Sequence, residues 1–127
     1  MQQRFTFKKE ERLTSKKVID QLFASGRSMF IYPFRVLYLA SLPENEYPAQ
    51  VVFSVPKRSF KQAVKRNLLK RRMREAYRLN KQHFYRNLQE QNKKLSIIFI
   101  YVEKEIKEYA VIEKGMIKAM KQLVSKG

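Results

Sequence analysis

The sequence predicts a small α+β domain in which helices pack on one face of a mixed β-sheet. The chain has 127 residues, the size of one domain, and 44% of them are hydrophobic, which is enough for a core. Apolar periodicity changes along the chain in the order helix, two or three strands, helix, strand, helix. The segment Leu95–Val102 is apolar almost throughout, as expected for a central strand covered on both faces. We therefore expect residues 1–127 to form a single domain.

The N-terminal part predicts an extended segment followed by a helix. Residues 1–11 are polar and basic, and alternation places Phe5 and Phe7 on one side of an extended chain. These rings either cover the core or line a binding groove. Apolar residues then recur every three or four positions, which predicts a helix over Ser15–Ser25 that ends at Gly26.

Three strands are expected next. Residues 27–31 are a short candidate, and Phe34–Leu39 and Gln50–Val55 are rich in β-branched and aromatic residues. Residues 42–48 contain two prolines and an asparagine, which indicates a hairpin loop. Alternation in the second strand separates two sets of side chains, Phe34, Val36 and Tyr38 on one face and Arg35, Leu37 and Leu39 on the other.

The second half of the chain predicts two helices around a strand. A basic helix is expected over about Lys61–Leu79. The polar segment Lys81–Gln91 either continues it or forms a separate helix after a break near Asn80. After the strand Leu95–Val102, an amphipathic helix is expected over Glu105–Val124.

The formal net charge of +17 is the strongest global signal. Charge of this size destabilises a compact chain unless an anionic partner neutralises it, so nucleic acid, an anionic membrane surface or an acidic protein is expected. The chain has no cysteine, its first twelve residues lack an apolar leader, and its longest apolar run is too short to cross a bilayer. We therefore expect a soluble cytoplasmic protein.

Groups for acid–base or metal chemistry are scarce. The chain has one aspartate, Asp20, one histidine, His83, and ten glutamates that lie mostly among lysines. Two-metal nucleases need clustered carboxylates, and the glutamates are interpreted instead as charge-balancing surface residues. We predict no catalytic and no metal-binding residue in this chain, so any reaction would use groups from elsewhere.

Positive charge is concentrated on the expected basic helix. Residues 57–81 contain eleven Lys or Arg and one acidic residue, Glu75. At 100° per residue the polar face carries six side chains, Arg66, Asn67, Lys70, Arg71, Arg74 and Arg78. A solvated face normally mixes charge signs, and this one does not, which favours contact with the phosphates of a structured polyanion. Lys65 and Arg72 point toward the buried side on this wheel.

The stretch Ser54–Arg78, SVPKRSFKQAVKRNLLKRRMREAYR, resembles the signature of the bacterial ribonuclease P protein component. That family has a strand ending in Ser-Val, a basic pair, and a helix with an Arg-Asn-Arg motif. The helix positions that match it are Arg66, Asn67, Lys70, Arg71 and Arg74. The sequence departs from the pattern in three places. Leu68 stands where the family usually has Arg, and Arg72 where many members have Leu. Lys61-Gln62 replaces the common Gly-Asn before Ala-Val, with one extra residue in the connection.

The resemblance implies a ribosomal protein S5 domain 2-like sandwich that acts as the protein subunit of ribonuclease P. In that enzyme the RNA subunit is the catalyst, holds Mg²⁺ and removes the 5′ leader of precursor tRNA, so ribonuclease P RNA and precursor tRNA are the expected partners, with neither membrane nor DNA. The expected RNA-binding residues are Lys57, Arg58, Lys65, Arg66, Asn67, Lys70, Arg71, Arg74 and Arg78. The residues expected to line a leader cleft beside the first helix are Phe7, Ile19, Phe23, Tyr38 and Ser54.

Other functions fit parts of the pattern. A non-enzymatic RNA-binding protein of the ribosome or its assembly would show the same charge distribution. A membrane-surface protein with a basic amphipathic helix would need that helix's apolar face to be free. A helix-turn-helix DNA reader fits less well, because strands flank the basic helix.

Overall fold

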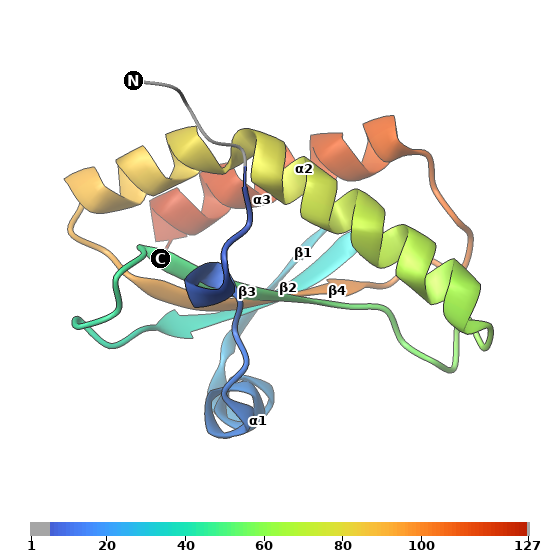
Figure 1. Ribbon diagram of the computed structural model, residues 1–127, viewed down its shortest axis with the longest axis horizontal. Coiled ribbons are helices and arrows are strands. Elements are labelled where there is room, and N and C mark those ends of the chain that lie inside the picture. Colours follow the sequence, from blue (N-terminus) through green and yellow to red (C-terminus); the bar gives the residue numbers. More distant parts are fainter. Residues whose placement is uncertain (1–5, 127) are drawn as a thin grey trace.

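A four-stranded β-sheet separates two long helices from a short one in the computed structural model, which describes residues 6–126 (Figure 1). In the sheet the order is β1-β2-β4-β3; β3 and β4 are parallel, and the other neighbours are antiparallel. The elements are a 3₁₀ turn η1 (Lys9–Glu11), α1 (Lys16–Ser25), β1 (Arg27–Ile31), β2 (Phe34–Ala40), β3 (Ala49–Ser54), α2 (Ala63–Glu90), β4 (Leu95–Tyr101) and α3 (Tyr109–Lys126). The mixed sheet and the α+β class agree with the sequence-based expectation.

The two faces of the sheet bury different clusters. Alternate residues of the strands, among them Val36, Phe53 and Phe99, form the main core with α2 and α3. The intervening residues, among them Leu37 and Ile98, form a smaller core with α1. We expected the helices on one face; α2 and α3 lie there, whereas α1 lies on the other (Figure 1). The reason is that the central strands are apolar on both faces, so each face needs a helix to cover it.

The short helix α1 is fixed at both ends. Ser15 caps its N-terminus by accepting a hydrogen bond from Val18 N at 3.3 Å. The segment before it joins the sheet edge, where Leu13 N donates to Val51 O at 2.8 Å. Leu22 is fully buried between the helix and the sheet. The start of the chain therefore crosses β3 from the α2 side of the sheet to the α1 side.

Helix α2 is continuous through Asn80, so residues 81–90 extend the basic helix. Asn80 Nδ2 donates within the helix to Ala76 O at 2.8 Å and across to Glu113 Oε2 of α3 at 3.1 Å. The helix ends in a Schellman motif: Lys93 N donates to Leu88 O at 2.9 Å, and Asn92 takes a left-handed φ of 56°. Because α3 packs along α2, this seam fixes the direction of the basic helix over the sheet.

Gly115 lies where α3 crosses the turn between β1 and β2. A Cβ atom there would collide with Tyr32 O and lie 2.7 Å from Pro33 Cδ. In an open helix, Gly to Ala would stabilise by up to about 1 kcal/mol. Here we expect Gly115→Ala to lower the free energy of unfolding by about 1–3 kcal/mol through overpacking. Urea denaturation tests this, with Ser125→Ala at an exposed position of the same helix as the control; a stabilised Gly115→Ala protein would contradict it.

Candidate nucleic-acid interface

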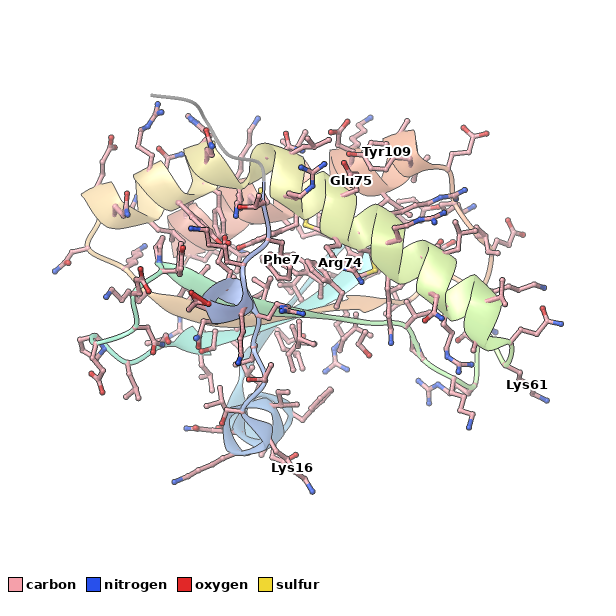
Figure 2. All side chains as sticks on the ribbon, viewed as in Figure 1. Phe7, Lys16, Lys61, Arg74, Glu75 and Tyr109 are labelled. Atoms are coloured by element: carbon pink, nitrogen blue, oxygen red, sulfur yellow. The ribbon has the colours of Figure 1, made fainter. Side chains whose placement is uncertain are left out.

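The N-terminal half of α2 presents a cationic face to solvent. Its opposite face is buried in the main core through Leu69, Met73, Ala76 and Tyr77. Lys65, Asn67, Arg71 and Arg74 are exposed, and Lys70 and Arg78 are half-buried. Figure 2 shows Lys61 at the N-terminal end of this helix and Arg74 along its length. We call the side chains of Asn67, Lys70, Arg71 and Arg74 the α2 basic face. Lys65 is exposed in the first turn of α2, although its position on the wheel points away from this face.

Arg66 is half-buried and has a structural contact. Its Nη1 donates to Phe60 O at 2.7 Å and to Lys61 O at 2.8 Å. These bonds tie the β3–α2 connection to the first turns of α2, whose N-cap residue Gln62 makes no side-chain capping bond. Arg66 thus orients the start of the basic helix in addition to any contact with RNA.

Arg72 points away from the α2 basic face. Its Nη1 donates to Lys107 O in the β4–α3 connection at 2.6 Å. This contact explains why the sequence places a cation on the inner side of the helix. It also joins the basic helix to the segment that leads into α3.

Arg71 and Arg72 are adjacent cations with opposite expected roles. We expect Arg72→Met to lower the free energy of unfolding by about 1–2 kcal/mol, because Lys107 O loses a charge-assisted donor. Arg71→Met removes an exposed cation, and we expect it to leave stability within about 0.5 kcal/mol while weakening RNA binding. Urea denaturation without RNA and filter binding with RNA separate the two effects. Equal loss of stability in both variants would contradict this assignment.

Arg78 is already engaged with a carboxylate. It forms an ion pair with Glu75, three residues before it on the same helix. Burial, followed by the charge of nearby Glu113, raises the pKa of Tyr109 on α3 to about 12. Glu75 contributes in the same direction, and the positive charge of Arg78 opposes the increase, so both residues lie close to Tyr109. Arg78 therefore belongs to the seam between α2 and α3 more than to the α2 basic face.

A basic hollow lies at the end of the sheet beside the start of α2. It has a volume of about 550 Å³ and is lined by Arg58, Ser59, Val102 and Lys104. Lys57 and Arg58 are both exposed, as predicted for RNA contacts. Lys104 is not among the predicted RNA contacts, because it lies between two glutamates and resembles a mixed-charge surface in the sequence. Only the parallel pairing of β3 with β4 brings its segment next to Arg58.

Three of the predicted cleft residues lie on the α1 side of the sheet. Ile19 is half-buried against the smaller core, and Phe23, one turn later on α1, is 58% exposed. Ser54 is half-buried at the end of β3, and alternation along the strand places it on the face that α1 covers. An exposed aromatic ring on the same side of the sheet as a polar strand end suits stacking on an unpaired base.

Two other predicted cleft residues lie elsewhere. Tyr38 is 5% exposed in the main core under α2 and α3, on the opposite face, so its assignment to the cleft is wrong. Phe7 packs beneath α2, with ring centroids 5.9 Å from Phe53 and 5.8 Å from Tyr77 (Figure 2). Phe7 thus covers the core and does not line the α1 cleft. Phe5 lies outside the described residues.

A buried ionic network fastens the start of the chain to α2. Glu11, expected at the surface, is only 1% exposed and pairs with Lys81, which is 5% exposed. Lys81 Nζ also donates to Thr6 O, and Tyr85 OH donates to Glu11 Oε1 at 2.7 Å. A second hydroxyl contact follows, from Tyr77 OH to Tyr85 OH at 3.0 Å. The expectation of a surface glutamate failed because its partner stands seventy residues away on another element.

The tyrosines of this network remain protonated at neutral pH. Burial raises the pKa of Tyr77 far above its usual value. Burial also raises the pKa of Tyr85, and the neighbouring Tyr77 and Glu11 add to the effect. Tyr85 therefore stays a hydrogen-bond donor to the Glu11 carboxylate. The network is a fixed anchor for the segment that carries Phe7 and leads into α1.

Within residues 6–126, no three His, Cys, Asp or Glu side chains lie close enough together to hold a metal ion. None of the helices in that range is long and apolar enough to cross a membrane.

Comparison with known proteins places this arrangement in a family. The family model described as Ribonuclease P matches residues 7–124. The ribonuclease P protein component of Porphyromonas gingivalis is 36% identical over 116 residues, which cover 91% of this chain and 85% of that protein. The chain belongs to the ribonuclease P protein family. It is a ribonuclease P protein component, a subunit of the enzyme that matures the 5′ end of tRNA.

Further relatives agree with this ribonuclease P assignment. The component from Chlorobium phaeobacteroides is 35% identical over 100 residues, covering 76% of this chain and 68% of that protein. The solved ribonuclease P protein of Thermotoga maritima has a TM-score of 0.70 at 23% identity, covering 88% of this chain and 96% of that one. The solved ribonuclease P protein of Staphylococcus aureus has a TM-score of 0.69 at 21% identity, and the match covers 89% of this chain and 94% of that one. These two structures show that the fold is shared.

Proposed function

We propose that this ribonuclease P protein binds the catalytic RNA through the α2 basic face and holds the 5′ leader of precursor tRNA on the α1 side of the sheet. Binding of the catalytic RNA is supported by the charge of the α2 basic face, whose charged side chains are all positive. Lys70, Arg71 and Arg74 have no ion-pair partner among residues 6–126, and Lys65 in the first turn of α2 has none there either. The acidic residue of this stretch, Glu75, pairs with Arg78. Phosphates of a folded RNA would neutralise that face.

The leader assignment is supported by Ile19, Phe23 and Ser54. A leader varies in sequence, so its contacts must tolerate any base, and aromatic stacking does so because every base has a π face. Phe23 offers such a ring, on the side of the sheet that also carries the Ser54 hydroxyl and the smaller apolar core. The basic hollow at Arg58 and Lys104 lies at the end of the sheet near the start of α2, where a phosphate backbone would find two further cations.

This proposal assigns Mg²⁺ and the reactive groups to the RNA subunit. The protein's contribution is to neutralise phosphate repulsion and to position substrate, which lowers the Mg²⁺ concentration that the RNA needs. Glu11, the one buried carboxylate described, is held by Lys81 and Tyr85. It is therefore not free to bind a metal ion or activate water.

Reconstitution tests the proposal. The purified protein alone is expected to leave precursor tRNA intact, and the protein with cognate ribonuclease P RNA is expected to release the 5′ leader at low Mg²⁺. Full cleavage by RNA-free protein would overturn the assignment of chemistry to the RNA. A protein that binds RNA but gives no stimulation at low Mg²⁺ would favour a role in ribosome assembly instead.

A further inference from the structure

A continuous row of side chains crosses all four strands on the α1 side of the sheet. The strand registers pair Phe30 of β1 with Arg35 of β2, Arg35 with Ile100 of β4, and Ile100 with Ser54 of β3. Partners at one register level point to the same face of a sheet. The four residues therefore form one strip, roughly 14 Å long at about 4.8 Å per strand, which ends at the cleft residue Ser54. We call it the transverse strip.

The transverse strip lies beyond the part of the sheet that α1 covers. The next row on the same face pairs Leu37 with Ile98, and both residues are buried in the smaller core with α1. In Figure 1 α1 crosses beneath one part of the sheet and leaves the rest of that face without a helix. Phe30 is accordingly 63% exposed and Arg35 is exposed, whereas Ile100 forms a nearly buried floor between them and Ser54.

The β1 end of the strip carries two side chains that suit a nucleic-acid strand, an aromatic ring and a cation. One exposed phenylalanine is ordinary on a protein surface, but Phe30, on the edge strand β1, stands next to the cation Arg35 of β2. Arg35 has no carboxylate partner among the residues from 6 to 126; its Nε donates to Ser28 Oγ at 3.3 Å, which orients the guanidinium on this face. An aromatic ring with an adjacent arginine is the combination that binds single strands without sequence preference.

We propose that Phe30 and Arg35 form a second leader subsite, in which Phe30 stacks on a base and Arg35 contacts a phosphate. This inference rests on the proposed leader binding and extends it from the Phe23–Ser54 cleft to the β1 edge of the sheet. A leader would cross the strands along the transverse strip. Leaders long enough to reach β1 gain affinity from this subsite, and shorter ones do not.

The absence of tryptophan from the chain allows a direct test of stacking. Phe30→Trp introduces a single tryptophan, whose fluorescence is followed. The holoenzyme is titrated with precursor tRNA carrying long or very short leaders. We expect strong quenching with the long leader and none with mature tRNA. Leu42→Trp, 62% exposed at the opposite end of β2, is the control and should not respond to either. No difference between long and short leaders at Phe30→Trp would overturn the subsite.

Affinity measurements separate this subsite from the proposed cleft. Phe30→Ala and Arg35→Gln are each expected to weaken long-leader binding by roughly fivefold or more, with no effect on short leaders. Arg27→Gln on β1 is the charge control for Arg35→Gln. Its register partner Tyr38 faces the main core, so Arg27 lies on the other side of the sheet from the transverse strip. If Phe23→Ala weakens leader binding and the two strip variants do not, the subsite is refuted and the cleft stands. If none of the three changes leader affinity, leader binding on this face is itself refuted.

Discussion

Substitution of Lys81 with Met is expected to lower the free energy of unfolding by about 3–5 kcal/mol. The change leaves the carboxylate of Glu11, 1% exposed, without its cation, and an uncompensated buried charge is costly. Tyr85 OH and Lys8 N still donate to this carboxylate, at 2.7 and 2.8 Å, so part of its desolvation remains offset. Equilibrium urea denaturation of the RNA-free protein, followed by circular dichroism, measures the loss.

Three further variants, one of them the single change Glu11→Gln, make this result specific to the ion pair. Lys65→Met removes an exposed lysine from the same helix and is expected to change stability by less than about 0.5 kcal/mol. The double variant Glu11→Gln with Lys81→Met removes both charges, and it should regain part of the loss because no buried charge is left unpaired. A Lys81→Met protein as stable as the parent, or a double variant that loses the sum of both single effects, would show that the pair contributes little.

The network matters for function because it fixes the segment before α1. That segment carries Phe7 onto the core beneath α2, passes β3 with Leu13 N bonded to Val51 O, and then leads into α1 with Phe23. Loosening the anchor should therefore weaken the proposed binding of the 5′ leader, although no residue of the cleft is removed. The same segment links the helix proposed to bind RNA to the helix proposed to hold the leader.

Most of the fold was predictable from local pattern. The apolar run Leu95–Tyr101 is an inner strand of the sheet, and the alternation of β2 correctly separated the side chains of its two faces. Alternation alone does not tell which face meets which helix. The family resemblance places Tyr38 in the cleft on the α1 side, but its register partner Ile97 lies in the main core under α2 and α3.

The errors at the site have one physical origin, which is contact between residues distant in sequence. Nothing near Glu11 in the sequence indicates Lys81, and nothing near Arg72 indicates the carbonyl of Lys107. Lys104 enters the basic hollow only because β3 and β4 run parallel. The transverse strip likewise exists only through strand register, since its four residues come from four separate strands.

Neutralising the centre of the α2 basic face is expected to have the largest effect on RNA binding. The triple variant Lys70→Gln, Arg71→Gln, Arg74→Gln should weaken binding to ribonuclease P RNA by roughly 100-fold at low salt. The slope of log K against log salt concentration should become less negative by about 2–3. Each lost phosphate contact means that roughly one counterion fewer is released on binding. Arg66 is left intact because it holds the β3–α2 connection. The free protein should be no less stable, since removing close like charges relieves repulsion.

The control must remove the same charge from elsewhere, because any loss from a chain of net charge +17 weakens attraction to RNA. Helix α3 offers three exposed lysines for a matched triple change to Gln, Lys114, Lys118 and Lys121. This variant has the same net charge as the α2 triple, so its binding loss measures the long-range contribution alone. We expect it to be several-fold at most, with a nearly unchanged salt slope. Equal losses from both triples would mean that RNA responds to total charge, and that the α2 basic face is not a docking surface.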